Sequence, residues 1–347
     1  MIETIAVIGS GSWGTAITRL LAPNADEVVV WSFEDEVVHG INENHHNPHQ
    51  LRDYELHSNV RATNSMEEAM RNATAVLVAV PSPFLRSTCK KLAPYVAPDV
   101  PVLVLTKGVE QGTGCLMADV VAQELGGEER IAVLSGPNHA EEISQGTVSA
   151  AVIASPTPSV AELFRDVLVC PAFRVYLSED VRGIEICAAV KNVIAIACGV
   201  AAELGAGDNT LAVLMTRGLA EVSRVAVAMG ADPLTCMGLA GMGDLVATCT
   251  SRHSRNRTFG EALARGESLE EYERRTGMVV EGAQAAKSIL ELARAHDVEV
   301  PITRAVNALL YEGADVDVVV DGLLGRQSVE EFYGVVPGGR HDGCANE

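Results

Sequence analysis

The feature that most constrains the fold of this chain is a glycine-rich hexapeptide near its start, Gly9-Ser10-Gly11-Ser12-Trp13-Gly14. It follows an apolar, β-branched run at 4–9 and opens a helical pattern at 12–21. In that context Gly9 permits a tight turn, Gly11 lets backbone amides approach a pyrophosphate, and Gly14 allows a helix to pack closely on a strand. The helix N-terminus then stabilises the anion. The alternative is a strand-to-helix turn without a ligand, but the context favours dinucleotide binding.

The apolar pattern changes along the chain. Short apolar runs separated by helical segments recur in the first half, at 27–31, 75–80, 102–105, 131–134 and 150–154. Near-continuous apolar strands of this kind indicate a parallel sheet covered on both faces. Later segments are longer and helical, at 184–204, 209–229, 256–265, 268–276, 281–296 and 302–312. The sequence therefore predicts an α/β fold, a Rossmann-type doubly wound parallel sheet followed by an all-helical C-terminal domain.

We place the predicted dinucleotide-binding domain at residues 1–185 and the helical substrate and catalytic domain at 186–335. Residues 336–347 are nearly devoid of apolar side chains, and we expect a disordered tail there. The first strand pattern starts almost at the N-terminus, so we expect no signal peptide. The apolar stretch 184–204 contains Glu185, Lys191, Asn192 and Glu203, which predicts a helix buried in protein and no integral membrane segment. A cytoplasmic protein is the expectation.

The charge balance excludes some partners. The formal net charge is -20, and nucleic acid or an anionic membrane surface would require a net supply of lysine and arginine. A small anionic substrate is still compatible, because a local basic cluster dominates at short range while distant charges are screened. None of the eight cysteines lies in a C-x-x-C pair, so we expect reduced thiols rather than a metal site. The histidine-rich stretch 45–57 is predicted to be a loop without metal.

The cofactor's ribose is expected at the end of the second strand, where the sequence reads Phe33-Glu34-Asp35-Glu36. Three acids and no cation would repel a 2′-phosphate, whereas a free 2′-hydroxyl could donate a hydrogen bond. The pattern favours NAD, with NADP as the alternative. The acids could instead serve only the start of the next helix.

Two lysines and an aspartate are candidates for chemistry. Lys107 follows the strand at 102–105, at the edge where ligands collect in open α/β sheets, although an exposed loop lysine would look the same. Lys191 lies in a strongly apolar segment, where desolvation would lower its pKa and suit it to proton transfer. The alternative is a lysine that snorkels to the surface. Asp244 follows Gly241-Met242-Gly243 and could pair with a buried lysine or begin a helix.

A basic cluster, Arg252-His253-Ser254-Arg255-Asn256-Arg257, precedes a predicted helix. Arginines, a hydroxyl and an amide at a helix N-terminus are suited to holding a phosphate group. The alternative is a solvated basic patch, but such a concentration of cations in so acidic a chain favours a small phosphorylated substrate.

Together these motifs resemble the NAD(P)-dependent glycerol-3-phosphate dehydrogenase family. The matching runs keep their order from residue 4 to about 330: Gly-Ser-Gly-Ser-Trp-Gly-Thr-Ala at 9–16, Thr-Lys-Gly at 106–108, Ser-Gly-Pro-Asn-His-Ala at 135–140, Ala-Val-Lys-Asn-Val-Ile-Ala-Ile at 189–196, Thr-Arg-Gly-Leu-Ala-Glu at 216–221, Gly-Met-Gly-Asp-Leu at 241–245, Ser-Arg-Asn-Arg at 254–257 and Val-Val-Glu-Gly at 279–282. Asn138 departs from the Thr or Ser common in bacterial members, and Trp31-Ser32-Phe33-Glu34 resembles eukaryotic relatives that use NAD.

The resemblance implies a role for each matching residue. The implied catalytic residues are Lys191 as proton donor and acceptor, Lys107 and Asp244. The implied cofactor contacts are Gly9, Gly11, Ser12, Trp13, Gly14, Phe33, Lys107, Ala140, Arg255, Val279 and Glu281. The implied substrate contacts are Lys107, Gly136, Asn138, Lys191, Asp244, Thr248, Ser254, Arg255 and Asn256.

The expected activity is interconversion of dihydroxyacetone phosphate and sn-glycerol 3-phosphate by hydride transfer with NAD(P)H. This would supply glycerol 3-phosphate for phospholipid synthesis, and a homodimer is the family-based expectation. One alternative is a two-domain reductase of another hydroxyacid or ketoacid, which the basic cluster at 252–257 disfavours. The other is a non-catalytic dinucleotide sensor, which the presence of Lys107, Lys191 and Asp244 together disfavours.

Overall fold

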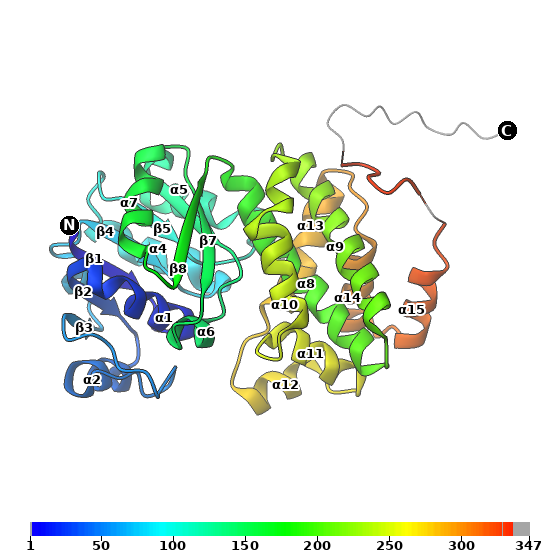
Figure 1. Ribbon diagram of the computed structural model, residues 1–347, viewed down its shortest axis with the longest axis horizontal. Coiled ribbons are helices and arrows are strands. Elements are labelled where there is room, and N and C mark those ends of the chain that lie inside the picture. The colour runs from blue at the N-terminus through cyan, green and yellow to red at the C-terminus, as the bar shows by residue number, and fades with distance from the viewer. Residues whose placement is uncertain (1, 328, 336–347) are drawn as a thin grey trace.

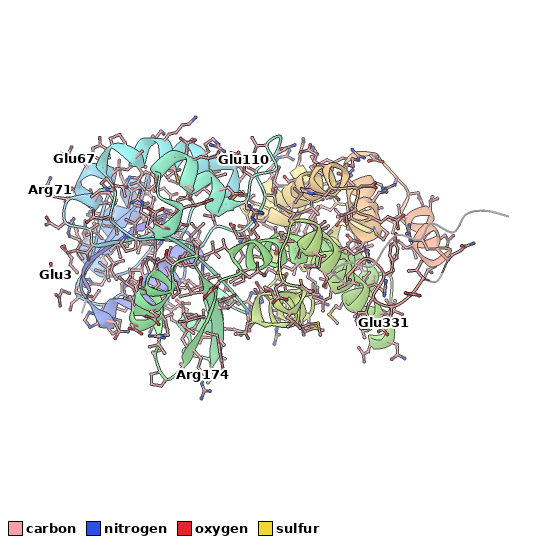
Figure 2. The ribbon with its side chains drawn as sticks, turned by 90° about the horizontal axis from the view of Figure 1, so that it is seen from above. Glu3, Glu67, Arg71, Glu110, Arg174 and Glu331 are labelled. Atoms are coloured by element: carbon pink, nitrogen blue, oxygen red, sulfur yellow. The ribbon has the colours of Figure 1, made fainter. Side chains whose placement is uncertain are left out.

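The computed structural model describes residues 2–327 and 329–335. A sheet-containing half, on the left in Figure 1, lies beside a half made of helices. Figure 2 is turned by 90° and shows the same two halves side by side, with Glu3 and Glu331 towards opposite ends. The predicted disordered tail 336–347 lies outside the described residues.

The described residues form one sheet of eight strands in the order β3-β2-β1-β4-β5-β6-β7-β8. Their bounds are Ile2–Ile8 for β1, Ala25–Trp31 for β2, Val60–Thr63 for β3, Ala75–Val78 for β4, Val102–Val104 for β5, Ile131–Ser135 for β6, Ser149–Ala154 for β7 and Phe173–Ser178 for β8. The strand reversal between β1 and β4 is the point where such sheets bind dinucleotides. The Rossmann-type prediction is confirmed.

The sheet is parallel, as predicted, at every pair except one, because β7 runs antiparallel to β6. The connection between them contains only a short helix, α6 (Ala140–Ser144), which does not carry the chain back across the sheet. The next helix, α7 (Pro158–Leu168), makes the full crossover, and β8 is parallel to β7. The sequence patterns also missed β3, which is short, and β8, which is mostly exposed or half-buried.

Helices cover both faces of the sheet. Ile5 and Val7 of β1 face α1 (Ser12–Leu21), α2 (Asp35–Asn44) and α7, whereas Ala6 and Ile8 face the opposite core. That second core contains α4 (Ser82–Leu92) and α5 (Met117–Leu125), and it continues into the helical half. Because side chains alternate between two covered faces, all four residues at 5–8 are apolar. The short helix α3 (Met66–Met70) follows β3.

The helical half is built around α8 (Val181–Glu203). The helices that follow α8 in the sequence are α9 (Asp208–Ala228), α10 (Asp244–Thr250), α11 (Arg255–Ala264), α12 (Leu269–Thr276), α13 (Glu281–Ala295), α14 (Pro301–Tyr311) and α15 (Val316–Leu324). In the described chain, α8 alone is long and apolar enough to cross a membrane, but 89% of its most apolar window is buried inside the protein. A helix that is apolar on all sides is expected at the centre of a bundle.

The helix α11 crosses α8 at very short range. A Cβ atom on Gly260 would lie 2.1 Å from the Ile196 carbonyl oxygen, and one on Gly199 would lie 2.0 Å from the Arg257 carbonyl oxygen. Both positions therefore require glycine. The crossing holds the start of α11, with the basic cluster, beside the apolar helix that carries Lys191. The predicted domain boundary near residue 185 falls within the first turns of α8, and the two-domain division stays a prediction.

Candidate active site

The glycine-rich turn has the geometry that its sequence predicts. Gly9 has a φ of +117°, and a Cβ there would lie 2.6 Å from the Ala79 carbonyl oxygen. A Cβ on Gly14 would lie 2.1 Å from the Gly9 carbonyl oxygen, so the helix can pack this closely only without a side chain. A Cβ on Gly11, by contrast, would have no other atom within 4 Å. The turn is thus closed on its protein side and open where a pyrophosphate would approach.

The histidine-rich segment 45–57 supports the glycine-rich turn. The sequence patterns did not predict this supporting role. Asn47 is fully buried, and its Nδ2 donates to the Ser10 carbonyl oxygen at 2.8 Å and to Thr15 Oγ1 at 2.9 Å. Ser12 Oγ donates to the Gln50 side chain, and His49 Nε2 lies 3.1 Å from a carboxylate oxygen of Glu36. A buried amide inside a polar loop gives little signal in a sequence, because its apolar surroundings come from distant elements.

The acids after β2 occupy the start of α2. Asp35 and Glu36 lie in its first turn, where negative charge is stabilised by the helix dipole. Phe33 has 77% of its surface exposed beside them. The helix role and the predicted cofactor role are compatible, because both place the acids at the carboxyl end of β2.

Lys107 and Lys191 come from the two halves and meet at one carboxylate. Lys107 Nζ donates to Asp244 Oδ2 at 2.9 Å, and Lys191 Nζ donates to Asp244 Oδ1. Lys191 Nζ also donates to Thr248 Oγ1 at 2.9 Å. Lys107 follows β5 and Lys191 lies within α8, so Asp244 at the start of α10 joins the sheet edge to the helical half. Neither alternative for the lysines, an exposed loop residue or a snorkelling side chain, fits this arrangement.

Burial and charge set the protonation of this cluster. Burial lowers the pKa of Lys191 to about 8, with the positive charge of Lys107 acting in the same direction and Asp244 opposing it. Burial alone would raise the pKa of Asp244, but the charges of Lys107 and Lys191 together hold it below its ordinary value. The cluster therefore contains an ionised carboxylate and a lysine that can give up its proton near neutral pH.

The turn after β6 lies beside the same carboxylate. Ser135 Oγ donates to Asp244 Oδ2 at 3.3 Å, and Gly136 follows with a φ of +149°. Asn138 Nδ2 donates to the Ala150 carbonyl oxygen at 3.0 Å, while its Oδ1 is buried without a hydrogen-bond partner among the described residues. An amide oxygen without a partner, in the turn after β6, is compatible with a substrate contact. Ala140, the predicted cofactor contact, begins α6 just beyond.

The basic cluster lies at the N-terminus of α11. Ser254 caps this helix, its Oγ accepting a hydrogen bond from the Arg257 amide at 3.3 Å. Arg255 Nη1 lies 3.4 Å from the Val279 carbonyl oxygen, which brings two predicted cofactor contacts together. Glu281 begins α13 two residues later. Arg257 instead pairs with Glu261 at 3.1 Å, so the three arginines of the cluster are not equivalent.

Asn256, which the sequence analysis names only as an expected substrate contact, also takes part in a series of buried amide hydrogen bonds. Its Nδ2 donates to Asn192 Oδ1 at 3.0 Å, and its Oδ1 accepts from the Gly282 amide at 2.8 Å. Asn192 directly follows Lys191 in α8. The chain therefore links the lysine helix, the start of α11 and the start of α13.

Comparisons with known proteins point to one family. Residues 4–161 match the family model described as the N-terminus of NAD-dependent glycerol-3-phosphate dehydrogenase, and residues 180–321 match the model of its C-terminus. Glycerol-3-phosphate dehydrogenase [NAD(P)+] 2 of Salinibacter ruber is 43% identical over 335 residues, covering 96% of this chain and 97% of that protein. The enzyme of Nocardia farcinica is 46% identical over 329 residues, covering 93% and 98%.

Solved structures agree. The crystal structure of glycerol-3-phosphate dehydrogenase from Coxiella burnetii superposes with a TM-score of 0.89 at 35% identity, covering 93% of this chain and 99% of that one. A ketopantoate reductase from Ralstonia eutropha, at 21% identity and a TM-score of 0.58, shares the fold alone.

Proposed function

The chain belongs to the NAD-dependent glycerol-3-phosphate dehydrogenase family, and from this premise we propose which of its residues carry the reaction. The enzyme interconverts dihydroxyacetone phosphate and sn-glycerol 3-phosphate with NAD(P)H. The observation that carries the assignment of roles is the meeting of Lys107 and Lys191 on the buried carboxylate of Asp244. The family assignment also decides against the two alternatives, a reductase of another acid and a non-catalytic sensor.

The glycine-rich turn fits the cofactor. The Ala79 backbone packs against Gly9, and the space beside Gly11 is free of protein atoms. A bound pyrophosphate requires this arrangement. Gly9, Gly11, Ser12, Trp13 and Gly14 would hold the diphosphate, and Phe33 the adenosine end. Ala140, Arg255, Val279, Glu281 and Lys107 would line the remainder of the site. The bound nicotinamide supplies or accepts the hydride at the substrate's C2.

Lys191 moves the proton. During reduction the carbonyl oxygen gains a proton, and an ammonium with a pKa of about 8 can donate it at neutral pH. Asp244 holds this ammonium in place and stays ionised. Because Lys107 and Lys191 together carry one more charge than Asp244 balances, the cluster also stabilises negative charge that develops on the oxygen. In the oxidation direction the neutral Lys191 accepts the proton.

The phosphate group would be held across the two halves. Arg255, Asn256 and Ser254 lie at the start of α11, where an arginine and a helix N-terminus both favour a dianion. Gly136, Asn138 and Thr248 would complete the substrate contacts. Anchoring the phosphate there fixes the carbonyl carbon close to the lysine cluster, which lowers the entropic part of the barrier.

We also propose a setting for the enzyme. A cytoplasmic homodimer that supplies glycerol 3-phosphate for phospholipid synthesis accords with the family and with the negative net charge of -20. A small phosphorylated substrate suits the local cluster of arginines despite that overall charge.

The direct test is an assay of NADH oxidation with and without dihydroxyacetone phosphate. Wild-type protein should oxidise NADH only with the substrate present, and Lys191→Ala should abolish turnover while still binding NADH. Lys287→Ala serves as the control, because Lys287 of α13 lies over the Tyr311 ring of α14 and its loss should leave turnover unchanged. Turnover near wild type in folded Lys191→Ala protein would remove Lys191 from the mechanism.

A further inference from the structure

Glu185 is a buried carboxyl group that the proposed mechanism does not use. It lies in the second turn of α8 with 6% of its surface exposed. Its Oε1 accepts a hydrogen bond from the Ala118 amide at 2.9 Å. Met117 and Ala118 are the first residues of α5, whose amides have no partner within their own helix. A side chain of α8 thus satisfies the N-terminus of a helix from the other half.

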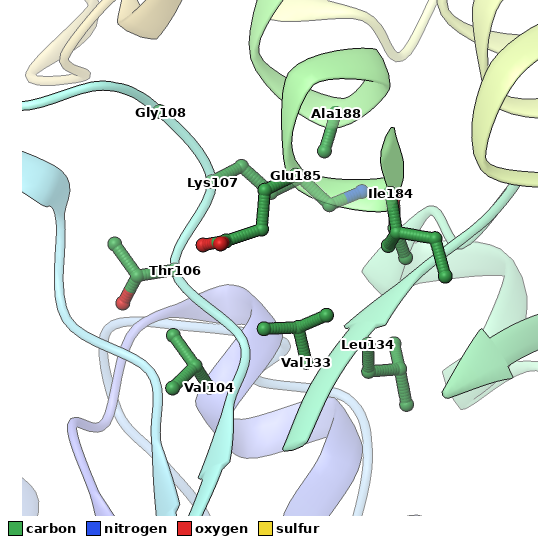
Figure 3. Close-up of a pocket in the computed structure, with 10 residues that line it drawn as sticks. Val104, Thr106, Lys107, Gly108, Val133, Leu134, Ile184, Glu185 and Ala188 are labelled. Carbon is green, nitrogen blue, oxygen red and sulfur yellow. The ribbon is translucent and has the colours of Figure 1, made fainter. Parts of the chain in front are cut away.

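The segment that leads into α5 contacts the segment that follows Lys107. Val109 and Leu116 form an antiparallel bridge, and the Glu110 amide donates to the Cys115 carbonyl oxygen at 2.9 Å. This bridge ties the segment that follows Lys107 to Leu116, the residue before α5. Figure 3 shows Glu185 reaching from α8 toward the loop that carries Thr106, Lys107 and Gly108. Glu185, Thr106, Lys107 and Gly108 line one small cavity, so a contact that fixes Glu185 to the start of α5 also restrains the loop that carries Lys107.

The same helix carries the other lysine. Lys191 lies on α8 about two turns beyond Glu185, and both lysines bind the carboxylate of Asp244. We propose that Glu185 is a positioning residue that holds the Lys107 loop against α8 and thereby sets the spacing of the two lysines. This inference rests on the proposed catalytic roles of Lys107 and Lys191.

The state of the carboxyl group guides the choice of variants. Burial raises the pKa of Glu185 to about 8, and the nearby charge of Asp119 acts in the same direction, so the group is largely protonated at neutral pH. Its Oε2 has no hydrogen-bond partner among the described residues. A cavity of about 10 Å³, lined by Glu185, Thr106, Lys107 and Ser135, is large enough for about one water that could bond it. Positioning therefore needs an acceptor of this length rather than a negative charge.

Three substitutions separate these properties. Glu185→Gln keeps the acceptor and its reach, Glu185→Leu keeps the size and loses the acceptor, and Glu185→Asp pulls the acceptor back by about one carbon–carbon bond. Glu221→Leu is the matched control. Glu221 of α9 is fully buried, and it accepts hydrogen bonds from the Ile302 and Thr303 amides at the start of another helix, α14. Each variant is measured for melting temperature and for kcat and KM with dihydroxyacetone phosphate and NADH.

We expect Glu185→Gln to keep kcat within about threefold of wild type and Glu185→Leu to lose roughly 10- to 100-fold, as a small displacement of a reacting group can cost. Glu221→Leu should lose melting temperature but keep kcat. A kcat of Glu185→Leu as high as that of the control would make Glu185 purely structural. An equal loss in Glu185→Gln would show that charge, not position, matters. If Glu185→Leu does not fold, the kcat of Glu185→Asp must be lower than that of Glu185→Gln. Equal kcat values for these two variants would overturn the proposal. A wild-type protein without turnover would instead refute the proposed function.

Discussion

At the scale of single residues, the chemistry depends on the balance of charge around Asp244. Two ammonium groups share this buried carboxylate, so one of them is held in an environment that favours loss of its proton. Lys191 is the more buried of the two and has its pKa lowered to about 8. Because this pKa lies near neutral pH, the rates of reduction and oxidation should depend on pH in opposite ways.

The pH dependence should differ between the two directions. Reduction needs protonated Lys191, so its rate should fall as the pH rises through about 8, whereas oxidation needs neutral Lys191 and should rise through the same range. Initial rates of both directions between pH 6 and 11, in buffers of constant ionic strength, give the two profiles. A limb near 10.5, the ordinary value for lysine, would show that burial does not act on Lys191 in the enzyme.

Arg255 should distinguish phosphorylated from unphosphorylated ligands. Losing a charge-assisted hydrogen bond costs roughly 1.5–3 kcal/mol, or about 10- to 150-fold in affinity. Arg255→Ala should therefore weaken binding of dihydroxyacetone phosphate far more than binding of dihydroxyacetone. Arg257→Ala is the control, because Arg257 is already paired with Glu261. Equal losses for both ligands would mean that Arg255 is structural or serves only the cofactor.

Cofactor choice should follow the acids after β2. Glu34, Asp35 and Glu36 would repel a 2′-phosphate and Phe33 offers it no cation, so we expect a higher kcat/KM with NADH than with NADPH. Glu34→Arg should narrow or reverse the preference, since arginine pairs with phosphate in bidentate fashion. Glu43→Arg makes the same charge change near the other end of α2 and should leave the preference unchanged. Equal or better kinetics with NADPH in the unmodified enzyme would show that these acids do not set the selectivity.

At the scale of elements, the crossing of α8 and α11 determines how the basic cluster lies relative to Lys191. The backbones approach so closely that Gly199 and Gly260 have no room for a methyl group. The buried amides of Asn192 and Asn256 lie on the same two helices and are joined by a hydrogen bond of 3.0 Å. Close packing and a buried polar contact together specify one arrangement of the pair.

Gly260→Ala should therefore destabilise the protein. Its Cβ would lie 2.1 Å from the Ile196 carbonyl oxygen, and overpacking of this kind costs about 1–3 kcal/mol or more. Gly322→Ala is the control, because that position in α15 has open space and a helical alanine is favoured over glycine by about 1 kcal/mol. Urea unfolding measures both. Unchanged stability of Gly260→Ala would mean that the helices can separate without cost.

At the scale of the whole molecule, exposed apolar side chains lie at the far end of the helical half. On α15, Val318 is 67% exposed and Leu324 is 76% exposed. An exposed apolar surface can mark a protein–protein contact, and α15 is our candidate for one. This end of the molecule is remote from the sheet (Figure 1), so a partner bound there would leave the cofactor turn accessible.

We therefore expect sedimentation equilibrium to give twice the chain mass of 36.6 kDa. Leu324→Asp should shift the protein toward the monomer, because a charge would be buried in the contact. Val148→Asp is the control, since Val148 is 77% exposed on the sheet half. A monomeric wild type would exclude the dimer, and an unaffected Leu324→Asp would place the contact elsewhere.

Local sequence patterns predicted most of the fold. The glycine-rich turn, six of the strands and the long helices follow from apolar periodicity and from glycine at sterically required positions, which are properties of neighbouring residues. The direction of β7 did not follow, because an apolar run reads the same in a parallel or an antiparallel pair. The strands β3 and β8 were not predicted, because short or half-exposed strands lack a continuous apolar run.

The sequence by itself determined which residue types could do the chemistry: two lysines, an aspartate and an arginine cluster in family-specific runs. Only the tertiary structure decided that Lys107 and Lys191, far apart in the chain, share Asp244. It also decided that Asn47 supports the glycine-rich turn and that Glu185 caps α5. Burial, and with it each pKa and each unpaired oxygen, depends on atoms brought together from distant segments. A sequence names the groups, but the packing of the sheet edge against α8 and α10 sets their distances and charges.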